Sequence, residues 1–386
     1  MFNLLIGRAL LRWIMSLGED DNPADPSEPA SEPNSKLDRP PEEVPNKSKI
    51  VYPRVQREAM GSLFEIYLAG TDRETLVGAG EQALDDIERL DRQLSHYRDD
   101  SDVARLNQHA VEHWVRLEPR MYHLLKRCAE ISVETDGAFD ITLGPLMKAW
   151  GFHRGEGRIP ADSEIARIME TVGIDRVQFD DDDNLLHFTV PGLEINLGAV
   201  GKGYAIDQAV ETLKLFGVTT AVLHGGQSTI YAMGEPPIAR SDGAMEYWSD
   251  GESDAFPPHS INSPASDSSG WRFEIKDPRD KETVMEVVHL NDEALSVSGN
   301  YEQFFESDGV RYSHILNPRT GRPTHGMLSV AVIGPNAEET DALSTAFFVM
   351  GRERTQEFCR TRSSLRVIIV EERGPDDIEV TRIGFD

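Results

Sequence analysis

The stretch NLGAVGKGYAID, residues 196–207, places three glycines and Lys202 where an apolar run meets a helical pattern. A P-loop needs four residues between its glycines and a Ser or Thr after the lysine. Here two residues separate Gly198 from Gly201, and Gly203 follows the lysine, so the segment is not a P-loop. Glycine amides, a cation and a helix N-terminus still suit an anion such as a phosphate. The alternative interpretation is a tight strand-to-helix turn with a solvated lysine.

A second candidate site lies in DALSTAFFVMG, residues 341–351. Asp341, Ser344 and Thr345 are spaced i, i+3, i+4, which places their oxygens on one face of a helix. A carboxylate and a hydroxyl, supplemented by a backbone carbonyl, form a partial oxygen shell that suits Mg²⁺. The alternative is that Asp341 caps the N-terminus of this helix.

Two ring-bearing residues stand next to polar loops. His314 leaves a strand-like run and precedes the turn-rich sequence NPRTGRP, so its imidazole is expected at the mouth of a loop. Tyr97 precedes a polar loop and could stack on an aromatic ligand. The alternatives are a structural histidine and a half-buried tyrosine at a helix end.

These residues need a scaffold, and the apolar pattern predicts one. Helical spacing predicts helices over 73–94, 119–135 and 203–216. The strands of the C-terminal half follow one another without helices between them, which favours antiparallel pairing over a doubly wound parallel sheet. The expected fold class is therefore α+β, with a mixed, largely antiparallel sheet core and flanking helices. Apolar, β-rich runs, several of them alternating, predict strands at 62–69, 219–225, 271–278, 293–299, 327–334 and 365–372.

The composition divides the chain into segments. Residues 1–18 are apolar but interrupted by two arginines and too short to span a bilayer. They fit an amphipathic helix that associates peripherally with a membrane, a signal-like sequence, or a helix packed on the protein itself. Residues 19–47 are acidic and proline-rich, which predicts a disordered linker. We expect the globular domain over 48–386, with a flexible insertion at 234–270.

The overall charge restricts the class of ligand. The chain carries 39 basic and 67 acidic residues, a net charge of −28. Such a protein repels polyanions, which argues against nucleic acid as a partner. Any phosphate ligand must therefore be held by local groups. Cys128 and Cys359 lie far apart without a CxxC motif, so they predict buried thiols and indicate neither a zinc site nor a disulfide framework.

Taken in order, these segments resemble the ApbE family of FAD:protein FMN transferases, formerly called thiamine-biosynthesis lipoproteins. The resemblance covers essentially all of residues 50–372. It rests on AMGS (59–62), LSHYRDDSDVARLN (94–107), DGAFDITLGPLMKAWGF (136–152), NLGAVGKGYAID, LHGGQSTIYAMG (223–234), SVSGNYEQFF (296–305), YSHILNPRTGRP (312–323) and DALSTAFFVMG.

The resemblance implies a fold and an activity. The family combines a mixed α+β domain with a second, smaller lobe, and FAD lies between them. In the presence of Mg²⁺ it moves FMN from FAD to a threonine hydroxyl of a target protein, and AMP leaves. The implied partners are FAD and this flavin-accepting protein. Many relatives are exported and lipid-anchored, which favours the cell envelope, facing the periplasm or exterior; the N-terminus lacks a lipid-acceptor cysteine, so the cytoplasm is the alternative.

The resemblance also implies roles for individual residues. Met60, Tyr97 and the backbone around Ala138, Phe139 and Asp140 would hold the adenosine half of FAD. Lys202 and Leu316 would contact FAD. The metal would be bound by Asp341, Thr345, Ser344 and the main-chain carbonyl of Ala199. His314 is the best available general base for the incoming hydroxyl.

Three positions depart from the family pattern. Asn196 stands where the family usually has an Asp that contacts FAD, Gln227 replaces the Asp of a GGD motif, and Asn317 replaces an Asp after His314. They leave two alternatives to transferase activity. One is an FAD pyrophosphatase that yields FMN and AMP, and the other is a protein that binds FAD without catalysis.

Overall fold

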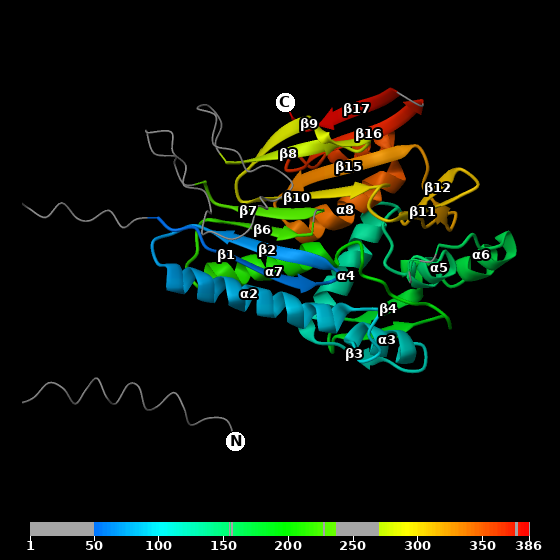
Figure 1. Cartoon of the computed structure of the whole chain (residues 1–386). Helices are drawn as coiled ribbons and strands as arrows, with labels where there is room; N and C mark the ends of the chain where they lie inside the picture. The colour runs from blue at the N-terminus through cyan, green and yellow to red at the C-terminus, as the bar shows by residue number, and fades with distance from the viewer. Residues whose placement is uncertain are drawn as a thin grey trace, which may run out of the picture. The chain divides into compact units, whose positions relative to one another are not determined.

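The apolar runs pair into an eight-stranded sheet in the computed structural model of the chain (Figure 1). Every neighbouring pair is antiparallel, which confirms the expected fold class. The strand order is β1 (Arg54–Ala59), β2 (Ser62–Leu68), β6 (Ala221–Gly225), β7 (Thr229–Met233), β10 (Glu293–Gly299), β15 (Met327–Gly334), β16 (Arg366–Gly374) and β17 (Asp377–Ile383).

The structure describes residues 50–153, 155, 157–226, 228–236, 270–374 and 377–385. The segments 1–18 and 19–47, most of the expected insertion at 234–270, and Gln227 lie outside these residues. All described residues belong to one unit, Ser48–Asp386. None of the helices in the described ranges is long and apolar enough to cross a membrane.

The central strands are buried on both faces, so they read as continuous apolar runs. Successive side chains of a strand point to opposite faces. On β15, Val330 and Val332 therefore join the core on the helical side, and Ala331 and Ile333 join the core on the other side. The helical side is formed by α2 (Arg73–Leu94), α4 (Pro119–Glu134), α7 (Gly201–Leu215) and α8 (Ala337–Met350), and α8 is followed by α9 (Arg352–Cys359).

The opposite face is covered by a hairpin of β8 (Trp271–Asp277) and β9 (Asp280–Leu290). Trp271 and Phe273 are buried there against the sheet. The indole Nε1 of Trp271 donates to the carbonyl of Gly234, 2.9 Å away, just after β7 ends. The backbone N–H of Gly270 donates to the carboxylate of Glu235 at 2.9 Å. These two bonds hold the end of β7 beside the start of β8.

A third apolar cluster forms the smaller lobe. Trp150 and Phe152 pack there with Ile165 and Leu316, and the Trp150 indole donates to the carbonyl of Gly321 at 2.8 Å. The lobe contains α5 (Gly144–Ala149), α6 (Asp162–Met169) and the short strands β11 (Phe304–Ser307), β12 (Val310–Ser313), β13 (Leu316–Asn317) and β14 (Arg322–Pro323). The remaining elements are α3 (Asp102–His109), the 3-10 turn Ile174–Arg176, and a small sheet of β3 (Val115–Arg116), β5 (Leu185–Phe188) and β4 (Val177–Asp180).

Candidate active site

A cavity of about 420 Å³ lies where the helical side of the large sheet meets the smaller lobe. It is lined by every residue that the sequence placed in the site except Ser344. These residues are Met60, Tyr97, Ala138, Phe139, Asp140, Asn196, Ala199, Lys202, His314, Leu316, Asp341 and Thr345. They come from segments far apart in the chain, so the fold brings together what the motifs could only place separately.

The glycine–lysine segment forms a hydrogen-bonded loop that leads into α7. The side chain of Asn107 holds the loop by two bonds to Ile195: its Nδ2 donates to the carbonyl at 3.0 Å, and its Oδ1 accepts from the N–H at 2.8 Å. Asn196 Oδ1 accepts from the N–H of Gly198 at 2.8 Å, which tightens the turn. Lys202 is the second residue of α7, and its Nζ donates to the hydroxyl of Ser228. A helix N-terminus and an ammonium group thus face one cavity, an arrangement that binds phosphates.

Asp341 does not cap its own helix, so that alternative is wrong. Helix α8 begins at Ala337, which places Asp341 in its second turn. Its Oδ2 instead accepts from the backbone N–H of Gly203 in the first turn of α7, at 2.9 Å. The side chain is buried, and burial raises the pKa of the carboxyl group, while the charge of Lys202 opposes the increase. Asp341 is therefore a buried carboxylate held by one helix N-terminus and facing a lysine.

The other expected metal ligands differ in their access to the cavity. Thr345 lines it, with its Oγ1 3.3 Å from the hydroxyl of Ser298. Ser344 is fully buried and does not line the cavity. Its hydroxyl donates to the carbonyl of Asp341 at 2.9 Å and lies 2.8 Å from Ser298 Oγ, so it is bonded within the protein. A carbonyl at Ala199, a hydroxyl and a carboxylate remain as oxygen donors.

This donor set fits Mg²⁺ when substrate phosphates complete the shell. The described residues contain no group of three or more His, Cys, Asp or Glu side chains that could hold a metal ion. Mg²⁺, however, commonly binds through one or two carboxylates, water and the phosphates of a substrate. A single buried carboxylate beside a helix N-terminus that is suited to a phosphate meets that requirement.

His314 follows β12 and presents one ring nitrogen for proton transfer. Its Nδ1 lies 3.0 Å from the carbonyl of Gln303. A carbonyl oxygen can only accept, so Nδ1 carries the hydrogen and Nε2 has the free lone pair of the neutral ring. Burial lowers the pKa of His314, the hydrogen bond to the carbonyl of Gln303 opposes this, and the charge of Lys202 lowers the pKa further. The lowered pKa favours the neutral imidazole, as a general base requires.

Tyr97 lines another part of the cavity and contacts the rings of two histidines. The ring of Tyr97 is stacked on His153 at 4.7 Å between centroids and lies 3.8 Å from the ring of His96. Tyr97 is 60% exposed, so this side chain remains accessible to a planar ligand. Met60 lies at the tight turn between β1 and β2, with a positive φ of 51°. Burial, and then the charges of His153 and Lys148, lower the pKa of His96 to about 4.

The segment 138–140 contributes mainly its backbone. Ala138 and Phe139 are almost fully buried. The carboxylate of Asp140 accepts from the N–H and the hydroxyl of Thr142, at 2.8 and 2.7 Å, and from the N–H of Ile174 at 3.2 Å. Burial raises the pKa of Asp140, although these hydrogen bonds oppose the increase. Because its oxygens already accept from Thr142 and Ile174, the side chain is bonded within this part of the structure and not towards the cavity.

Several lining residues were not identified from the sequence: His96, Ser228, Ser298, Glu302 and Gln303. Ser298 had a visible signal, because SVS in a buried strand places polar side chains on the face that packs against α8. Ser296 on the same strand lies 2.9 Å from the hydroxyl of Thr340. Of the departures from the family pattern, Asn196 lines the cavity. Asn317 forms a turn, in which its Oδ1 accepts from the N–H of Arg319 at 2.9 Å.

The fold and the cavity define an α+β protein with a site suited to a phosphate-bearing nucleotide. More particularly, the chain belongs to the ApbE family, whose family model matches residues 60–369.

The chain is similar to members of this family over most of its own length and of theirs. The FAD:protein FMN transferase of Escherichia coli (strain K12) is 29% identical over 329 residues, which cover 83% of this chain and 84% of that protein. The crystal structure of the ApbE protein of Thermotoga maritima matches with a TM-score of 0.70 and 29% identity, and covers 85% of this chain and 96% of the other. The flavinyl transferase ApbE of Pseudomonas stutzeri matches with a TM-score of 0.69 and 29% identity over 86% and 95% of the two chains.

Proposed function

We propose that this protein transfers FMN from FAD to a threonine hydroxyl of a target protein, in a Mg²⁺-dependent reaction that releases AMP. One observation carries the proposal. Lys202, His314 and the buried side chain of Asp341 line one cavity at the N-terminus of α7. The relatives named as FAD:protein FMN transferase and flavinyl transferase support the same activity.

The cavity offers a different surface to each part of FAD. The exposed ring of Tyr97, Met60 and the backbone at 138–140 would hold the adenosine half, since a tyrosine face stacks on a planar base. The pyrophosphate would lie at the first turn of α7, where Lys202 neutralises charge. Leu316 supplies an apolar contact on the smaller lobe. FAD would therefore lie between the lobe and the large sheet.

The transfer exchanges one phosphorus–oxygen bond for another. The threonine Oγ attacks the phosphorus of the FMN half, and its proton passes to Nε2 of His314. The phosphoanhydride bond breaks, and AMP leaves with the bridging oxygen. Positioning and charge neutralisation account for most of the catalysis of such reactions. Lys202 orients the pyrophosphate, and Asp341, Thr345 and the carbonyl of Ala199 would hold Mg²⁺, which neutralises phosphate oxygens when it is bound.

The direct test is to incubate the purified protein with FAD, Mg²⁺ and an acceptor protein that carries a threonine in a flavinylation motif. In-gel flavin fluorescence of the acceptor, with one AMP released per flavin attached, is the expected result. The same acceptor with Thr→Ala should remain dark. Release of FMN and AMP without labelling would instead identify an FAD pyrophosphatase. FAD binding without any AMP would identify a non-catalytic binding protein.

A further inference from the structure

Helices α7 and α8 cap each other's N-termini. One of the two capping residues, Asp207, is not among the site residues described above. Within the described structure, neither N-cap residue, Val200 of α7 or Asn336 of α8, makes a side-chain cap hydrogen bond. Asp341 on α8 supplies the cap of α7, as described above. The cap of α8 comes from Asp207 on α7, whose Oδ1 and Oδ2 accept from the N–H groups of Ala337 and Glu338 at 2.9 and 2.8 Å.

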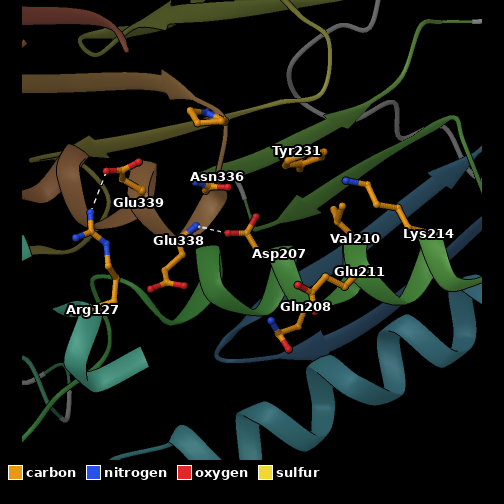
Figure 2. Close-up of a pocket in the computed structure, with 11 residues that line it drawn as sticks. Arg127, Asp207, Gln208, Val210, Glu211, Lys214, Tyr231, Asn336, Glu338 and Glu339 are labelled. Carbon is orange, nitrogen blue, oxygen red and sulfur yellow. Dashed lines mark hydrogen bonds and ion pairs between the residues drawn. The ribbon is translucent and has the colours of Figure 1, made fainter. Parts of the chain in front are cut away.

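Figure 2 shows Asp207 rising from α7 towards the first turn of α8. The two helices touch there at backbone distance. A Cβ added to Gly203 would lie 2.1 Å from the carbonyl oxygen of Ala337 and 2.7 Å from Cβ of Asp341. At this point α8 lies directly against the backbone of Gly203, and the two carboxylates accept hydrogen bonds across the contact in opposite directions.

The position of α8 along α7 matters for the site, since the site residues are divided between the two helices. Lys202 belongs to the first turn of α7, whereas Asp341 and Thr345 belong to α8. Mg²⁺ demands near-octahedral geometry with oxygens at about 2.0–2.1 Å. A functional constellation must be held within about 0.5 Å to work. A small shift of α8 would therefore move the carboxylate relative to the lysine.

We propose that Asp207 is a positioning residue for FMN transfer: by capping α8 from α7, it fixes the place of Asp341 relative to Lys202. The proposal rests on the proposed function and assigns Asp207 no contact with FAD. The surroundings of Asp207 disfavour the ionised form of its side chain. Burial, and to a smaller extent the charge of Glu211, raise its pKa to about 6, although the hydrogen bonds from the N–H groups of Glu338 and Ala337 and the charge of Lys214 oppose the increase. Glu338 next to it has a pKa raised to about 7, first by burial and then by Asp207.

If capping were the only role of Asp207, a short side chain at the N-cap position of α8 could accept from the same N–H groups locally. The side chain of Asn336 stands at that position in α8 and makes no cap bond in the described structure. The cap comes instead from a buried acid 130 positions earlier in the chain. Such a bond adds what a local cap lacks, namely a fixed relation between two helices.

The test compares Asp207→Ala and Asp207→Asn with a control cap. Asp72 accepts from two N–H groups of α2, at 3.1 and 3.3 Å, and no described residue of α2 lines the cavity. Asp72→Ala therefore removes a two-bond carboxylate cap without touching the site. For each variant, three quantities are measured: the Mg²⁺ concentration for half-maximal transfer, the rise in melting temperature on adding Mg²⁺ to the FAD complex, and FAD affinity without metal.

Asp207→Ala should raise the half-saturating Mg²⁺ concentration at least ~10-fold, as expected when a group that orients a ligand is lost. It should also reduce the Mg²⁺-dependent rise in melting temperature, while FAD affinity without metal stays unchanged. Asp207→Asn keeps one acceptor oxygen and should fall between the wild type and Asp207→Ala, and it serves if the alanine variant does not fold. Asp72→Ala should lower the melting temperature and leave the Mg²⁺ response as in the wild type.

Asp207 variants with a lower melting temperature but a wild-type Mg²⁺ response would overturn the positioning role and leave the proposed function intact. A wild-type protein that neither transfers FMN nor responds to Mg²⁺ would overturn the proposed function itself, and the positioning role with it.

Discussion

The proposed mechanism depends most on Asp341, and two substitutions separate the roles that it would have. Asp341→Ala removes both the negative charge and the acceptor for the N–H of Gly203. Asp341→Asn removes the charge but keeps an oxygen for that N–H. In the native protein, burial disfavours the ionised carboxylate and raises its pKa. The neutral asparagine does not have this cost of burial. The two variants therefore differ in the cap and agree in the missing charge.

Both variants should lose FMN transfer by at least ~100-fold, equivalent to about 2.7 kcal/mol of transition-state stabilisation. Their stabilities should differ. Asp341→Ala should cost about 1 kcal/mol for the lost cap, a shift in melting temperature of no more than about 2–4 °C in a domain of this size. Asp341→Asn should melt within about 1 °C of the metal-free wild type, or above it, because it retains the cap bond.

The assays are a thermal melt without Mg²⁺ and the rate of acceptor labelling against Mg²⁺ concentration. Glu353→Ala, on α9 and outside the cavity, provides a control for the loss of an exposed carboxylate away from the site. Asp341→Asn with a wild-type rate would refute the assignment of Asp341 to the metal. A destabilised but fully active Asp341→Ala would reduce the residue to a cap of α7.

Three further predictions concern the base, the helix contact and the ligand. Because burial and Lys202 lower the pKa of His314, the acid limb of kcat/KM should lie below the ordinary histidine value of about 6.5, and His314→Gln should abolish that limb and lower the rate by about 10²–10⁴-fold. An unchanged profile would assign the proton to another group. Gly203→Ala should destabilise by about 1–3 kcal/mol through overpacking against Ala337, whereas Gly201→Ala, whose Cβ would meet no described atom within 4 Å, should be neutral in the same melt. Calorimetric titration should give tighter binding for FAD than for FMN or ATP, because Tyr97 and the 138–140 backbone would contact adenosine; equal affinity for FAD and FMN would contradict those assignments.

Much of the scaffold was accessible from the sequence because burial leaves a periodic signal. The expected helix over 73–94 coincides with α2, and the expected strands at 293–299 and 327–334 coincide with β10 and β15. Among the strands that were missed, besides β1 and β7, are β9 and β17. Their sequences, DKETVMEVVHL and DIEVTRI, mix charged residues with apolar ones, because β9 belongs to a two-stranded hairpin and β17 lies at the edge of the sheet.

The residues that line the candidate site were named from their type and order in the sequence, but the hydrogen bonds among them were not predicted. The start of α8 could have been read from Asn336 and Glu339, which have the spacing of a capping box. That reading would have excluded Asp341 as a cap of its own helix. The mutual caps could not be predicted, because they join residues 138 and 130 positions apart, and nothing in the local sequence of either helix marks its distant acceptor. Ser344 shares a helical face with Asp341 by spacing, yet its hydroxyl turns to the backbone of its own helix.

The bonds from Trp271 to Gly234 and from Gly270 to Glu235 have a use in protein engineering. They fix where the chain leaves β7 and where it returns to β8, so foreign sequence placed between these points would start and finish at neighbouring positions. The entropy of closing a loop rises only slowly, by about 0.6 kcal/mol for each doubling of its length. A fluorescent reporter or an affinity module grafted between residues 236 and 270 should therefore leave the sheet paired. Both anchor points lie outside the residues that line the cavity, so the graft would be attached away from the candidate site.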